Sequence, residues 1–142
     1  MELSIQYVAG LFDGEGSVHV VRNRPGWGAS VSVGVCNKEV IDKLYTTFGG
    51  STRMQLTKKG REFFVWRMGI TKATEFLSSI QPFCIIKRSV IVVALKLASI
   101  MNERASKPDG RRALSNDEEL LRLVLVHKIH CLNANVSFTS EL

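Results

Sequence analysis

The chain has 142 residues, of which 45% are hydrophobic and 23% charged, and its formal net charge is +6. That length suits one compact domain with a hydrophobic core, and the composition is ordinary for a globular protein. The sequence gives no sign of a membrane span, because its longest apolar run, residues 90–97, contains Lys96 and follows Lys87 and Arg88.

In chain order, the predicted elements are a helix at residues 5–13, strands at 18–22 and 31–35, a helix at 38–48, strands at 51–56 and 63–70, and helices at 71–80, 87–103 and 115–132. Gly49 and Gly50 end the second helix, and Thr71 is a plausible N-cap for the third. This αββαββα order predicts an α+β fold with one antiparallel sheet backed by helices. We expect a single domain over 1–142, with its core at about 1–104 and a C-terminal helical part at about 115–135.

Charge and cysteine content bear on partner and compartment. A basic domain of this size favours a polyanion such as nucleic acid as its partner, although a merely basic soluble protein would carry the same charge. Cys36, Cys84 and Cys131 are odd in number and far apart. They predict reduced thiols in an intracellular protein, in the cytoplasm or an organelle, and we see no signal peptide.

The most informative segment is residues 7–17, YVAGLFDGEGS. A small-residue helix runs into Asp13 and Glu15, and Gly16 is a natural C-cap. A carboxylate is unfavourable at the negative end of a helix dipole, so its presence there suggests a bound cation. Read alone, Glu15 could equally be a solvated residue at a helix end.

Residues 8–16, VAGLFDGEG, resemble the signature of the LAGLIDADG homing endonucleases position by position. The order of predicted elements extends the resemblance over most of the chain. It implies a four-stranded saddle-shaped sheet over the DNA major groove, with extra C-terminal helices in this chain. It also implies a site-specific endonuclease that uses Mg²⁺ or Mn²⁺ to cut both strands of a long pseudo-palindromic site.

The resemblance gives roles to the residues of the signature. Glu15 is the expected direct metal ligand, with help from the Gly14 carbonyl, and Asp13 is expected to bond backbone amides near the helix ends. Ala9, Gly10, Asp13 and Gly14 are the expected dimer interface, because small residues let two helices approach closely. The signature occurs once, so we expect a homodimer; packing against a helix of the same chain is the alternative.

Two further residues are catalytic candidates. Lys87 matches a family lysine that follows a Pro-aromatic segment, with the adjacent Arg88 as a second choice and a solvated lysine as the alternative. Asn37 stands where the family often has a polar residue that orders water, although it is also the natural N-cap of the helix at 38–48.

Strand alternation selects a DNA-reading face, supplemented by cations of loops and edges that suit phosphate contacts. The fourth strand is ambiguous, since either Trp66 or Arg67 could be the residue that faces outward. The predicted DNA-binding residues are His19, Val21, Arg22, Asn23, Arg24, Ser30, Ser32, Gly34, Arg53, Gln55, Lys58, Trp66 and Arg67.

The sequence thus predicts an intron-encoded homing endonuclease that acts on double-stranded DNA. An intron maturase or a DNA-binding regulator that keeps the fold without cleavage is the alternative. Neither the target sequence nor the host intron can be read from the chain.

Overall fold

The computed structural model describes residues 2–22, 26–106 and 115–134, which form one sheet and its covering helices. The elements are α1 (Ile5–Glu15), β1 (Gly16–Arg22), β2 (Trp27–Val35), α2 (Lys38–Phe48), β3 (Ser51–Leu56), β4 (Glu62–Gly69), α3 (Thr74–Ile80), the 3-10 helix η1 (Gln81–Phe83), α4 (Arg88–Ala105) and α5 (Asn116–Asn133). The αββαββα order with two further helices confirms the predicted fold class.

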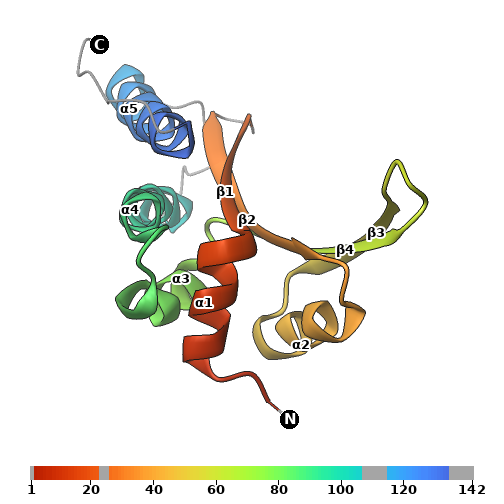
Figure 1. Ribbon diagram of the computed structural model, residues 1–142. Helices are drawn as coiled ribbons and strands as arrows, with labels where there is room; N and C mark the ends of the chain where they lie inside the picture. Colours follow the sequence, from red (N-terminus) through yellow and green to blue (C-terminus); the bar gives the residue numbers. More distant parts are fainter. Residues whose placement is uncertain (1, 23–25, 107–114, 135–142) are drawn as a thin grey trace.

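The four strands pair antiparallel in the order β1-β2-β4-β3. The β1–β2 and β3–β4 hairpins therefore pair with each other through β2 and β4, and α2 connects β2 to β3 along the chain. The α-helices of the described residues, α1 to α5, gather on one face of the sheet, and no described helix covers the other face (Figure 1). That open face is where a large ligand can reach the strands.

One hydrophobic core lies between the sheet and the helices, with members from α1 to α5. Phe76 of α3 lies at its centre: its ring is 4.9 Å from both Phe48 and Trp66 and 5.7 Å from Phe12, between centroids. Alternation places the inward valines of β1 and β2 in this core. No described helix is long and apolar enough to cross a membrane.

Helix α1 passes directly into β1 at Gly16, whose backbone is extended (φ −84°). A Cβ at this position would lie 2.3 Å from the Phe12 ring, so no larger residue fits there. Gly16 is the C-cap, as predicted, but it is required for this close approach and not for a left-handed conformation. Gly49 does adopt the left-handed side (φ +81°) where it ends α2.

Helix α3 begins later than the sequence indicated. The chain first makes a turn, in which the Ala73 amide donates to the Ile70 carbonyl, and Ala73 caps α3 without a side-chain bond. The Thr71 N-cap prediction is wrong, because its carbonyl accepts from Asn102 of α4 and the residue belongs to the turn.

Candidate functional site

Asp13, near the C-terminal end of α1, holds the segment that leads into α4. Its Oδ2 accepts from the Ile85 amide (2.7 Å) and its Oδ1 from the Lys87 amide (3.0 Å). Burial raises the pKa of Asp13, but hydrogen bonds from the backbone amides of 85–87 outweigh this effect and lower it below 3.8. The carboxylate therefore stays ionised and structural, which confirms its predicted role in bonding backbone amides.

Lys87 is brought to the same end of α1. Its Nζ donates to the Asp13 carbonyl (3.1 Å), where the helix dipole favours a cation. Cys84 adds a further link, from its Sγ to the Ala9 carbonyl (3.6 Å). Burial, with the nearby Asp13 charge, raises the pKa of Cys84 to about 11, so the thiol remains a protonated donor.

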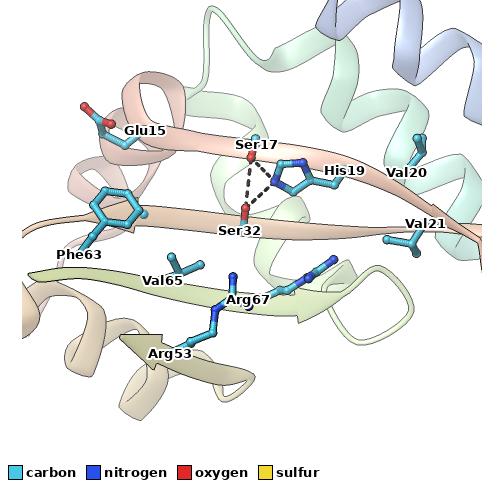
Figure 2. Close-up of a pocket in the computed structure, with 11 residues that line it drawn as sticks. Glu15, Ser17, His19, Val20, Val21, Ser32, Arg53, Phe63, Val65 and Arg67 are labelled. Atoms are coloured by element: carbon cyan, nitrogen blue, oxygen red, sulfur yellow. Dashed lines mark hydrogen bonds between the residues drawn. The ribbon is translucent and has the colours of Figure 1, made fainter. Parts of the chain in front are cut away.

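Glu15 is the last residue of α1 and its side chain is exposed. Within the described residues it has no hydrogen-bond or ion-pair partner, and its carboxylate points away from Ser17 and Ser32 (Figure 2). Because both oxygens of Asp13 already accept amides, Glu15 is the carboxylate of the signature available to a cation.

The donors at this end of the helix fit a hard divalent cation only in part. Glu15 and the exposed Gly14 offer oxygen ligands, the kind that Mg²⁺ prefers. No group of three His, Cys, Asp or Glu side chains in the described part of the chain could hold a metal ion. Glu15 and Gly14 thus provide only part of an oxygen-donor site within the described residues.

Asn37 stands at the start of α2. Its Oδ1 accepts from the Val40 amide (3.0 Å) as the N-cap of α2. It shares a surface hollow with Ser4 and Tyr7, at the opposite end of α1 from Glu15. The capping interpretation is confirmed, and the role of Asn37 in ordering water near a metal stays a prediction.

One face of α1 is exposed and lined by small residues. Gly10 and Gly14 are exposed, and a Cβ built on either meets nothing within 4 Å. Ala9 does not belong to this face, contrary to the prediction, since it is fully buried in the chain's own core. Next to the helix end lie Ile85 and Ile86, which are 81% and 75% exposed despite being large and apolar.

The open face of the sheet carries a shallow cavity of about 570 Å³. Figure 2 shows Glu15 at one end of this surface and polar side chains of β1, β2, β3 and β4 along it. The lining residues are Glu15, Ser17, His19, Val20, Val21, Ser32, Gly34, Arg53, Phe63, Val65 and Arg67.

His19 is held by two serines on this surface. Its Nε2 lies 2.7 Å from the Ser17 Oγ and 2.8 Å from the Ser32 Oγ. Burial, and then the positive charge of Arg67, lower the pKa of His19 below 6.5, so the ring is neutral at physiological pH. Ser17 was missed by sequence reasoning, although it has the same strand phase as His19.

The structure resolves the ambiguity of β4. Trp66 is fully buried, and its Nε1 donates to the Gly49 carbonyl (2.7 Å). Arg67 is exposed on the open face, where its Nε donates to the Ser30 Oγ (3.1 Å). The prediction of Trp66 as a DNA contact is therefore wrong, because the ring completes the core.

Register confirms that the predicted residues of β3 share this face. Arg53 pairs with Val65 and Gln55 with Phe63, and directly paired residues of antiparallel strands point the same way. Phe63 was not predicted. Its ring covers Gly34, where a Cβ would lie only 2.6 Å from it.

The remaining predicted contacts are scattered. Arg22 has the strand phase of the fully buried Val18, and its Cζ lies 5.5 Å from the centre of the Trp27 ring, so the structure does not bring it to the open face. Lys58 is exposed in the turn between β3 and β4. Asn23 and Arg24 lie outside the described residues.

No protein-family model matches the sequence, and no curated protein does either. Solved structures do match. The archaeal intron-encoded homing endonuclease I-Vdi141I complexed with DNA has a TM-score of 0.67 and 19% identity over 90% of this chain and 82% of its own. The homing endonuclease I-TnaI has a TM-score of 0.65 and 18% identity, over 96% of this chain and 100% of its own.

A third similar structure is I-SmaMI bound to uncleaved DNA target in the presence of calcium ions. Its TM-score is 0.67 and its identity 22%, over 94% of this chain but only 49% of its own. The fold is that of the LAGLIDADG homing endonucleases, so the resemblance found in residues 8–16 is confirmed at the level of the fold.

Proposed function

We propose that the protein is a site-specific endonuclease that cuts double-stranded DNA as a LAGLIDADG-type homodimer. The observation that carries the proposal is the polar, basic open face of the sheet, which ends at the exposed Glu15 in a fold shared with DNA-bound homing endonucleases. As such enzymes are encoded in introns, we place it among intron-encoded, intracellular proteins.

The open face suits the major groove, which β-ribbons can enter and read. Arg67 and Gln55 offer donors that match guanine and adenine edges. Lys58, at the tip of the β3–β4 hairpin, suits a phosphate contact that positions the protein without reading sequence. The net charge of +6 favours the same polyanionic partner.

A divalent ion, Mg²⁺ or Mn²⁺, would be held by Glu15 and the Gly14 carbonyl together with the same groups of the second subunit. When bound, it supplies Lewis-acid polarisation of a phosphate and a more acidic water. The Lys87 ammonium, fixed at the Asp13 carbonyl, would stabilise negative charge that develops on the phosphate oxygens.

The homodimer rests on the exposed face of α1. Gly10 and Gly14 each cost roughly 1 kcal/mol of helix stability relative to Ala, and nothing within the described chain needs their lack of a side chain. A second copy of α1 packed there would use it and would also cover Ile85 and Ile86. A two-fold axis along this face brings both copies of Glu15 together.

A maturase or a DNA-binding regulator without cleavage is the second candidate. It would use the same sheet surface, but it has no need for an exposed carboxylate at Glu15 or for Lys87 at the same helix end. Both are present, which favours the enzyme.

The test compares wild type with Glu15→Gln and, as a matched control, Glu103→Gln, which alters an exposed residue of α4. A target is first selected from random-sequence duplexes with Ca²⁺, then placed in a supercoiled plasmid and incubated with and without Mg²⁺. We expect wild type and the control to linearise the plasmid only with Mg²⁺, and Glu15→Gln to bind without cutting. If the wild-type protein binds the site but never cuts it, the endonuclease proposal is contradicted and the DNA-binding regulator remains as the candidate function.

A further inference from the structure

Two arginines on the open face differ in how they are held. Arg67 of β4 donates its Nε to the Ser30 Oγ (3.1 Å), while its Nη groups have no partner within the described residues. Arg53 of β3 faces the same way, since Ser51 and Arg53 pair with Arg67 and Val65, but no described residue bonds its guanidinium. One arginine is anchored and the other is not.

Ser30 is poorly placed to contact DNA itself. It is only 5% exposed and lies on β2, an inner strand of the sheet between β1 and β4. Among the described residues, its hydroxyl bonds to Arg67. The prediction that Ser30 contacts DNA therefore needs revision, because its hydroxyl accepts a hydrogen bond from Arg67.

We propose that Ser30 is a positioning residue that aims the guanidinium of Arg67 at a guanine in the major groove, and that Arg53 contacts the DNA backbone without reading a base. This inference rests on the proposed function. Guanine presents two acceptors, O6 and N7, which the two Nη groups of a fixed arginine can contact together.

Anchoring matters because bidentate contact requires a defined plane. A bond from Nε to Ser30 restrains the guanidinium while leaving the Nη edge available. An unanchored guanidinium such as that of Arg53 can adjust to a phosphate, for which a lysine is an adequate substitute. The two arginines therefore predict opposite responses to the same Arg→Lys change.

The experiment selects bound sequences from random-sequence duplexes with Ca²⁺ present, for wild type and for Arg67→Lys, Arg53→Lys, Ser30→Ala and Ser30→Thr. Ser99→Ala, on an exposed position of α4, is the matched control. The readout is the base preference at each position of the site. A merely structural defect would lower the preference by a similar factor at every position, whereas a positioning role predicts a loss at one base pair. Thermal melting shows whether each variant is folded.

We expect Arg67→Lys to lower the preference for guanine about tenfold or more at one base pair in each half-site. Ser30→Ala should weaken the preference at that same base pair, and Ser30→Thr, which keeps the hydroxyl, should restore it. Arg53→Lys and Ser99→Ala should leave the profile unchanged.

Two results separate this inference from the proposed function. If wild type selects a site but Ser30→Ala keeps every preference, or loses them evenly, the positioning role of Ser30 is wrong and the endonuclease proposal stands. If wild type selects no sequence at all, both are overturned. Loss of guanine preference in Arg53→Lys would also contradict the assignment.

Discussion

Asp13 shows how one side chain can organise a site without entering its chemistry. Its two oxygens accept amides of Ile85 and Lys87, and its own carbonyl accepts the Lys87 ammonium. The segment that carries Lys87 is thereby fixed to the end of α1, next to Glu15. Asp13, the first acid of the signature, thus holds backbone segments together, whereas Glu15, the second acid, is exposed and bonds no described residue.

Asp13→Asn should destabilise the protein by about 1–3 kcal/mol at neutral pH, because an amide cannot accept both backbone donors. The wild-type pKa is lowered in the folded state, so the contribution of Asp13 is fully present above pH 3.8 and is lost as pH falls through the folded value. Denaturant unfolding at pH 7 and pH 3 checks this. An equal loss at both pH values would contradict the role.

At the scale of elements, α1 has two different faces. Val8, Ala9 and Phe12 are buried in the core, whereas Gly10 and Gly14 are exposed over open space. A helix that had only to cover the sheet would carry alanine at these exposed positions, because alanine stabilises helices. The exposed glycines therefore support the proposed packing of a second copy of α1 against this face.

Gly10→Leu tests that face. The change should leave the monomer folded, because a Cβ there meets nothing, but it should block helix-to-helix contact and convert a dimer into a monomer. Light scattering at micromolar concentration measures the mass, and circular dichroism checks the fold. Ser99→Leu, at an exposed position of α4, is the control for an added leucine and should stay dimeric. A dimeric Gly10→Leu would place the interface elsewhere.

At the scale of the whole molecule, one chain provides one open sheet face and one available carboxylate of the signature. In the proposed homodimer, a two-fold axis would give two sheet faces and two such carboxylates, which would match a long DNA site with two equivalent halves. The I-SmaMI chain, of which this chain matches only 49%, is about twice as long as the aligned unit, so a single longer chain has room for a second unit.

The selected target should therefore contain two inverted half-sites. Scrambling one half should weaken binding at least tenfold, because each mismatched base pair costs about 1–3 kcal/mol. Competition binding with intact and half-scrambled duplexes measures this. A target without two-fold symmetry, or one bound equally well with a single half, would contradict the homodimer.

The sequence by itself determined the order of elements and the bounds of α2 and β3, because turn glycines and apolar periodicity are local signals. It also determined the signature, since the motif spans one continuous segment, whereas the amides that Asp13 accepts belong to Ile85 and Lys87 and were identified only by the tertiary structure. Only the tertiary structure decided the facing of β4 and the burial of Ala9, because each depends on which distant residue packs against it. The same holds for Ser30 beside Arg67: thirty-seven residues separate them in the chain, and only the pairing of β2 with β4 brings the hydroxyl to the guanidinium.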